Sequence, residues 1–401
     1  MRNVTREPAL VLDAARVDAW RIERQLFGRT KGANPVDVAR TLVGVQAQVT
    51  SSAALAIALR SKRPRGNAPA IEQTTKALRE RRLVRSWAMR GTLHLFAADD
   101  VPTVAAALGG KDNWRRPAWL RWFGVTEPQM DRLIDAIGEV LDDGRPRTRA
   151  ELAQEIGARL GPAQGELLLG SWGSTLKVAS DRHYLVQASE DAAGTRFVRA
   201  SRWLDGWRDE DEIEALGKLV DRYLAAYGPA TLKEILRWWG VSVVAVMKPI
   251  VEELGEALTQ VEVAGVRTYV RTSDLDSIES TRPKKGMVHL VGGFDPFIVG
   301  AGLRDHLLPA AHLKRISRTA GWISPVVLVD GTAAGVWDSR RTSKRLELTV
   351  DPFESPSRKL RSSIAEAAEA IGEAQGVPVT VDFGRVFTAK GPKLVIGPAN
   401  A

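Results

Sequence analysis

The chain has 401 residues, 44% of them hydrophobic, with no cysteine, five histidines and a formal net charge of +9 at pH 7. Its length predicts two to four domains with an ample core, and the lack of cysteine excludes disulfides, thiolate zinc sites and cysteine nucleophiles. Few, scattered histidines disfavour a metal centre, and no apolar run is long enough to predict a transmembrane helix or a signal peptide.

The first section of the chain predicts helices followed by a β-hairpin. From Arg60 to Arg90 it holds ten Lys or Arg and only two acids, a concentrated positive charge that favours nucleic acid over a membrane as partner. The turn of the hairpin is expected at Met89-Arg90-Gly91. The helical runs are 18–27, 36–45, 53–59 and 70–80, and the strands are 83–87 and 92–96.

Two carboxamides, Gln46 and Gln48, stand one residue apart where the second helical run ends. In a helix, side chains two apart point to nearly opposite sides, whereas in an extended segment they share a side. Spacing alone therefore favours a helix end whose amides satisfy local backbone groups. The alternative is an extended connector in which both side chains converge on one water molecule or substrate.

The same pattern recurs twice in degenerate form. Thr148 and Thr231 stand at N-cap positions of helices in these copies. The second copy has helical runs at 128–141, 148–160 and 166–179 and strands at 184–187 and 196–199. The third has helical runs at 212–227, 232–239 and 242–258 and strands at 260–264 and 267–271.

The last section is richer in strands. Asp330-Gly331 is a favourable hairpin turn between two of them. A single amphipathic helix is expected to cover these strands. The strands fall at 287–291, 323–329, 335–337, 346–350 and 379–386, and the helix at 355–376.

Three helices followed by a hairpin is the plan of a winged helix, a DNA-binding unit. Three such units on a basic chain predict an α+β protein with tandem winged helices. The competing interpretation is an α+β protein whose hairpins are incidental.

The chain resembles the winged-helix DNA glycosylases of the AlkZ and YcaQ type, and matching segments occur through most of its length. The weakest match lies at 128–200. The matching segments are Gly44-Val45-Gln46-Ala47-Gln48, residues 83–94, residues 222–231, Arg237-Trp238-Trp239-Gly240, Phe294-Asp295-Pro296-Phe297 and residues 321–331.

The resemblance implies three tandem winged helices and a C-terminal β-barrel-like domain in a C shape that wraps DNA. The implied domains are 1–125, 126–208, 209–280 and 281–401. The resemblance also implies that the partner is double-stranded DNA with alkylated or crosslinked purines and not a membrane. It implies a monomer with a cytoplasmic, nucleoid-associated location.

The implied activity is monofunctional hydrolysis of the N-glycosidic bond of purines alkylated at N7 or N3, including unhooking of interstrand crosslinks, and it leaves an abasic site. The resemblance assigns catalysis to Gln46 and Gln48, with no metal and no cofactor. Ala47 is smaller than the corresponding residue of some members, which we expect to leave room beside the lesion. Self-resistance in a natural-product cluster is one biological role for this activity.

Basic side chains near the first hairpin, near several tryptophans and late in the chain are the candidates for DNA contacts. An ordinary solvated face or an edge hairpin with charged side chains is the competing interpretation. The candidates are Arg85, Arg90, Lys111, Arg115, Arg116, Arg340, Arg341 and Arg345.

Two further residues carry suitable chemistry but have plainer interpretations. Asp295 is a possible acid or base, although an Asp-Pro turn between aromatic residues is favoured. His94 either meets a phosphate or is a buried strand residue. For the whole chain, the competing function is a non-catalytic winged-helix DNA-binding protein, either a transcriptional regulator or a lesion-binding protein.

Overall fold

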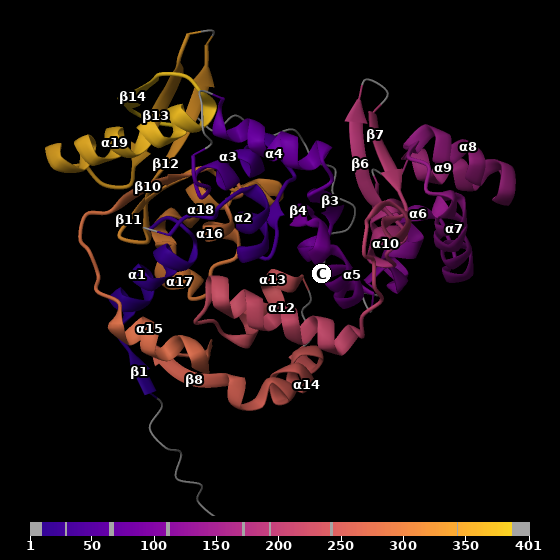
Figure 1. Cartoon of the computed structure of the whole chain (residues 1–401), viewed down its shortest axis with the longest axis horizontal. Coiled ribbons are helices and arrows are strands. Elements are labelled where there is room, and N and C mark those ends of the chain that lie inside the picture. Colours follow the sequence, from indigo (N-terminus) through magenta and orange to yellow (C-terminus); the bar gives the residue numbers. More distant parts are fainter. Residues whose placement is uncertain are drawn as a thin grey trace, which may run out of the picture.

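The structure is a computed structural model of the whole chain, and it describes residues 10–28, 30–63, 68–109, 113–170, 173–191, 194–240, 244–342 and 344–386. Within these ranges helices combine with three β-sheets, which confirms the expected α+β class. Figure 1 shows the helical sections and their hairpins following one another along the chain.

The first section forms the predicted helices and hairpin, with differences at the helix ends: the helix expected at 18–27 spans Ala14–Arg24, and the one expected at 53–59 begins at Thr50. The second helix ends at Thr41, because Val43 and Gly44 both have left-handed backbones, with φ of +54° and +91°. A Cβ on Gly44 would lie 2.4 Å from the ring of Phe96, so glycine is required there. The elements are α1 (Ala14–Arg24), α2 (Pro35–Thr41), β2 (Val45–Gln46), α3 (Thr50–Ala58), α4 (Ala70–Arg79), β3 (Leu83–Trp87) and β4 (Leu93–Ala97).

The second section contains two helices that the sequence did not predict, α5 and α6. Every residue of α5 is buried, so the helix shows no polar face and no helical period in its sequence. The single helix expected at 166–179 is instead two helices, and Gly173, with φ +81°, precedes the second. The elements are α5 (Val101–Leu108), α6 (Pro117–Phe123), α7 (Glu127–Val140), β5 (Arg147–Thr148), α8 (Arg149–Leu160), α9 (Pro162–Gly170), α10 (Ser174–Asp181), β6 (Val186–Asp191) and β7 (Gly194–Val198).

The hairpins of these two sections share one six-stranded sheet, in the order β2-β4-β3-β6-β7-β5. They join where Arg85 of β3 pairs with Gln187 of β6. The predicted caps are present as well: Thr148 and Thr231 each form a capping box with the Glu three residues later.

The third section packs its helices against the first and adds a separate three-stranded sheet. The N-terminal strand β1 pairs in parallel with β8, so the beginning of the chain completes this section. The elements are β1 (Leu10–Leu12), α11 (Ala200–Trp203), α12 (Glu212–Tyr227), α13 (Leu232–Trp239), α14 (Val244–Leu254), β8 (Leu258–Val263), β9 (Val266–Arg271) and α15 (Leu275–Ser280).

The C-terminal section contains an open five-stranded sheet, in the order β10-β11-β12-β13-β14. Its outer strands do not pair with each other within the described residues, so the expected barrel-like closure is wrong. β13 and β14 run parallel because α19 crosses between them. The elements are β10 (Val288–Val291), α16 (Pro296–Val299), α17 (Arg304–Leu307), α18 (Leu313–Ile316), β11 (Val326–Val329), β12 (Thr332–Arg341), β13 (Leu346–Pro352), α19 (Arg358–Gln375) and β14 (Val379–Phe383).

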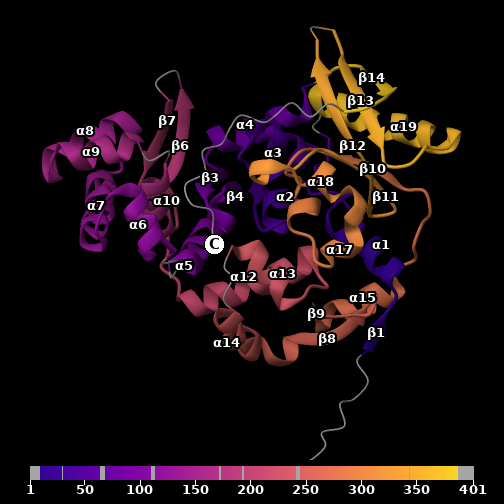
Figure 2. The ribbon, with the colours of Figure 1, turned by 180° about the vertical axis from the view of Figure 1, so that it is seen from behind.

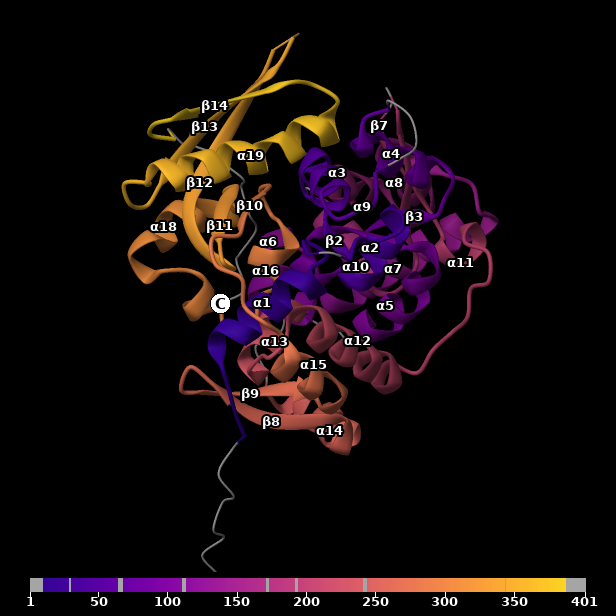
Figure 3. The same cartoon turned by 60° about the vertical axis from the view of Figure 1, so that its left-hand side comes forward.

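Two hairpins project to the same side of the molecule. In Figures 1 and 2, β6–β7 and β12–β13 rise on either side of α3 and α4. Figure 3, turned by 60°, still places both at the same end, with β8, β9 and α14 at the opposite end. Among the described residues, no helix is both long and apolar enough to cross a membrane.

Candidate active site

The segment that carries Gln46 and Gln48 is not helical. After the left-handed turn at Val43 and Gly44, Gln46 pairs with His94 of β4, and the amide of Ala47 donates to the Leu93 carbonyl at 2.6 Å. β2 ends at Gln46, and Gln48 lies in the bend that follows it. The helix-end interpretation is therefore wrong, because α2 ends at Thr41. The convergence of both side chains on one water molecule or substrate stays a prediction.

Ala47 faces the opposite way. Its side chain is completely buried and belongs to the apolar cluster that includes Leu42, Ala53 and Leu95. The expectation that a small residue here leaves room beside a lesion is wrong, because this position faces the protein core. Its size is set by packing against the neighbouring helices.

The two carboxamides have different environments. Gln46 is only 8% exposed, and its Oε1 accepts from Arg90 Nη2 at 3.0 Å. Gln48 is exposed, and its Oε1 accepts a long hydrogen bond of 3.4 Å from the Leu93 amide. Both partners are donors, which fixes the oxygen as the contacting atom in each case. Among the residues that the structure describes, neither amide nitrogen has a protein acceptor, so both NH2 groups remain available.

Arg90, expected to contact DNA, is engaged with protein atoms. It lies in the tight turn η1 (Met89–Gly91) between β3 and β4, with φ +57°. Besides Gln46 it binds the carbonyl of Trp238 in α13, at 2.8 Å. Burial lowers the pKa of Arg90 to about 10, so the guanidinium remains charged at neutral pH. Sequence reasoning missed this contact, because nothing in either segment signals that α13 packs on the first hairpin.

His94 is 2% exposed, so the interpretation as a phosphate contact is wrong and that of a buried strand histidine is confirmed. Its ring stacks beside Phe96, with centroids 5.8 Å apart.

Asp295 is also unavailable as an acid or base. It is completely buried, forms a bidentate ion pair with Arg60 at 2.6 and 2.9 Å, and caps α16 through the Phe297 amide. The favoured interpretation of a structural turn is confirmed.

The other basic candidates of the first two sections differ in exposure. Arg85 lies within β3 and donates to Thr50 Oγ1 at 3.3 Å. Arg115 is paired with Asp131 at 3.1 Å and with Glu127, so its charge is locally balanced. Arg116, at the start of α6, is exposed. Lys111 lies outside the described residues.

The remaining candidates surround the tip of the β12–β13 hairpin. Arg340 and Arg345 both pair with Glu347, at 2.6 and 2.9 Å, and Arg341 donates to Gln375 of α19 at 3.2 Å. Lys344 lies in the turn itself. Of these four basic side chains, only Arg340 and Arg345 pair with a carboxylate in the described part of the chain, and they share that of Glu347, so the tip is positive.

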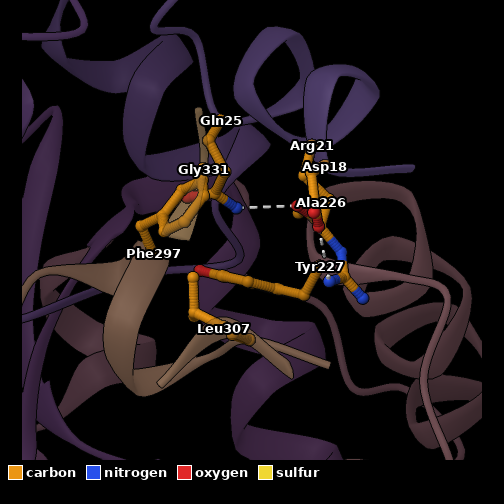
Figure 4. A pocket seen from close by; sticks show the side chains of 9 residues that line it. Asp18, Arg21, Gln25, Ala226, Tyr227, Phe297, Leu307 and Gly331 are labelled. Carbon is orange, nitrogen blue, oxygen red and sulfur yellow. Dashed lines mark hydrogen bonds and ion pairs between the residues drawn. The ribbon is translucent and has the colours of Figure 1, made fainter. Parts of the chain in front are cut away.

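A small cavity lies elsewhere, between α1, α12 and the C-terminal section (Figure 4). Two of its polar side chains bind backbone carbonyls: Arg21 donates to Gly228 and Pro229, and Gln25 donates to Ala226 at 2.7 Å. Asp18 pairs with His306 at 2.7 Å, and Gln25 Oε1 has no hydrogen-bond partner among the described residues. The lining residues are Asp18, Arg21, Gln25, Ala226, Tyr227, Phe297, Ala301, Leu307 and Gly331. Across the described ranges, no three His, Asp or Glu side chains are grouped as metal ligands.

Comparison with known proteins gives one consistent result. Residues 39–374 match the family described as DNA glycosylase AlkZ-like. The chain is 34% identical over 369 residues to a Streptomyces sahachiroi protein named interstrand DNA cross-link repair glycosylase, covering 90% of this chain and 96% of that one. The solved structure of the Streptomyces sahachiroi DNA glycosylase AlkZ superposes with a TM-score of 0.84 at 31% identity, covering 93% of this chain and all of that one.

Proposed function

The chain belongs to the AlkZ-like DNA glycosylase family, and from this premise we propose that it is a monofunctional DNA repair glycosylase. Its substrates are purines alkylated at N7 or N3, and the name of the Streptomyces relative supports including interstrand crosslinks among them. The product is an abasic site. The observation that carries the proposal is the non-helical segment with Gln46 and Gln48, whose amide NH2 groups have no protein acceptor among the described residues.

The chemistry suits two neutral carboxamides. An N7- or N3-alkylated purine is already cationic, so it leaves as a neutral base when the bond to C1′ breaks. Water then forms the new C1′–O bond and loses a proton to solvent. The protein must hold the water and stabilise the oxocarbenium-like sugar, and carboxamides do this by orientation, since they are poor bases.

We further propose that the chain contains three winged helices with domain limits at 1–125, 126–208 and 209–280, followed by a domain at 281–401. In this arrangement the molecule forms a C shape around duplex DNA. The projection of β6–β7 and β12–β13 to one side, on either side of α3 and α4, supports this proposal (Figures 1 and 2).

The basic side chains that we propose for phosphate contact are Arg85, Arg116, Arg340, Arg341 and Arg345. Arg115 is left out because two carboxylates already balance it. We propose that the protein acts as a monomer on double-stranded DNA in the cytoplasm, at the nucleoid.

The test uses duplex oligonucleotides with one 7-methylguanine or one nitrogen-mustard crosslink. We expect release of the free base, detected by mass spectrometry, and strand cleavage after alkali. Borohydride should trap no covalent adduct, because no amine attacks the sugar. Tight binding of both duplexes without any base release would contradict the proposal and identify a non-catalytic DNA-binding protein.

A further inference from the structure

Gln46 depends on its neighbours for its orientation. β2 has only two residues, lies at the edge of its sheet and pairs with β4. His94 is the partner of Gln46 in register, so the two side chains lie on the same face. A glutamine side chain has three rotatable bonds, and a fixed contact is needed to hold its amide in one direction.

Arg90 supplies that contact. Its Nη2 donates to Gln46 Oε1 at 3.0 Å and lies 3.5 Å from His94 Nε2, while its Nη1 donates to the Trp238 carbonyl at 2.8 Å. His94 Nδ1 lies 2.9 Å from the Thr92 carbonyl, so Nδ1 carries the hydrogen and Nε2 is an acceptor for Arg90. The guanidinium is thus fixed by acceptors from two sections of the chain.

The third section anchors Arg90. Trp238 stands in the last turn of α13, where carbonyls lack helical partners and carry partial negative charge, which suits a guanidinium. Gly240, the left-handed C-cap of α13, brings this helix end against the turn: a Cβ there would lie 2.6 Å from the Arg90 amide nitrogen. The end of α13 therefore abuts the turn that carries Arg90.

We propose that Arg90 is a positioning residue, which holds Gln46 Oε1 and thereby directs the Gln46 amide NH2 toward the DNA. This inference rests on the proposed glycosylase function. It makes α13, in the third section, a structural part of an active site in the first.

The contact also separates the roles of the two carboxamides. Gln46 Oε1 already accepts a charge-assisted hydrogen bond, so the group that Gln46 offers to substrate is its NH2 donor. The Gln48 residue is exposed, and its Oε1 holds a long hydrogen bond from Leu93 of 3.4 Å, so this oxygen is the better acceptor for the attacking water. Gln46 is thus the donor of the pair and Gln48 the acceptor.

A double-mutant cycle tests the positioning role. In single-turnover reactions at saturating protein, Arg90→Met should lower the excision rate about 10- to 100-fold, as expected for a misplaced group. Because Arg90 acts through Gln46, the same change in a Gln46→Ala background should have almost no further effect. Additive losses would overturn the proposal. Arg90→Lys, which can satisfy fewer of the acceptors, should give a smaller loss and provides a second folded variant.

Arg237→Met is the matched control, since Arg237 lies in α13, beside Trp238, and donates to the Ala301 carbonyl at 2.8 Å without touching Gln46. It should lower the melting temperature but leave the saturated rate unchanged. A merely structural Arg90 would behave like this control. If Arg90 acted only as a phosphate contact, its loss would change the Kd for DNA and its salt dependence, and not the saturated rate.

Carboxylate substitutions test the division of roles. Gln46→Glu keeps the contact with Arg90 but removes the NH2, so excision should fall by at least 10-fold. Gln48→Glu keeps an acceptor for water and should retain more activity than Gln46→Glu. The reverse order would overturn the assignment of donor and acceptor.

A structural readout separates this inference from the glycosylase proposal. In a crystal structure of Arg90→Met, the Gln46 side chain should leave the rotamer seen here or lose its defined position. An unchanged Gln46 would overturn the positioning role whether or not the protein excises bases. Loss of position together with an inactive wild-type protein would refute the glycosylase proposal alone.

Discussion

At the scale of the residue, two left-handed positions decide whether a catalytic pair can form. Val43 and Gly44 stop α2 and send the chain into β2, which pairs Gln46 with His94 and leaves Gln48 in the bend that follows. The sequence suggested a helix end, because apolar residues continue through 45 with helical spacing. The cause of the difference is tertiary: Phe96 occupies the space next to Gly44.

Gly44→Ala should therefore destabilise the protein by about 1–3 kcal/mol, because it combines a left-handed backbone with a contact to Phe96. The rate of base excision by this variant should also fall. Gly217→Ala is the matched control: it lies within α12 with open space around it and should stabilise by about 0.5–1 kcal/mol. Urea unfolding measures both. Equal free energies of unfolding for Gly44→Ala and the wild type would contradict this account.

At the scale of the element, local patterns located most helices and strands, but not their partners. The hairpins at 83–97 and 186–198 were expected as separate wings and instead share a sheet through Arg85 and Gln187. That pairing joins residues about a hundred positions apart, and a period-2 pattern carries no information on it. The buried helix α5 was missed for a related reason, since its surroundings remove the polar face that makes a helix recognisable.

The tip of β12–β13 carries the most concentrated positive charge among the proposed DNA contacts. Replacing Arg341 and Lys344 by serine should weaken DNA binding and reduce the slope of log K against log salt by about 0.9 for each lost phosphate contact. Arg267→Ser, at an exposed position of β9 in the third section, is the control and should leave the slope unchanged. Fluorescence anisotropy at several salt concentrations gives both slopes. An unchanged slope for the hairpin variant would show that this tip does not contact phosphate.

At the scale of the whole molecule, buried polar contacts join segments far apart in the sequence. Arg60 and Asp295 pair across 235 positions, and Phe27 lies beneath the guanidinium, 4.0 Å from it. The resemblance predicted the family and the α+β class correctly. It also implied a barrel-like C-terminal domain, whereas the C-terminal sheet is open. Strand patterns alone cannot settle closure, because the same alternation occurs in open and closed sheets.

His289, whose ring lies 5.0 Å from that of Phe27, should make the stability of the protein depend on pH. Burial, with Lys31 and Arg60 nearby, lowers the pKa of His289 to about 4, against about 6.5 in an unfolded chain. Between these values the unfolded chain binds more protons, so the free energy of unfolding rises with pH and is fully regained above about 6.5. The loss of stability between pH 7.5 and pH 5 should therefore be greater for the wild type than for His289→Gln. Equal losses, measured by urea unfolding, would contradict it.

The most direct test of the central claim is single-turnover excision of 7-methylguanine by Gln46→Ala and Gln48→Ala. Gln154→Ala, an exposed glutamine of α8, serves as the control. Each active-site variant should excise roughly 100- to 1000-fold more slowly than the wild type, as for the loss of a preorganised group, with DNA affinity nearly unchanged. Full excision rates in both variants would contradict the claim that this pair of carboxamides is the hydrolytic site.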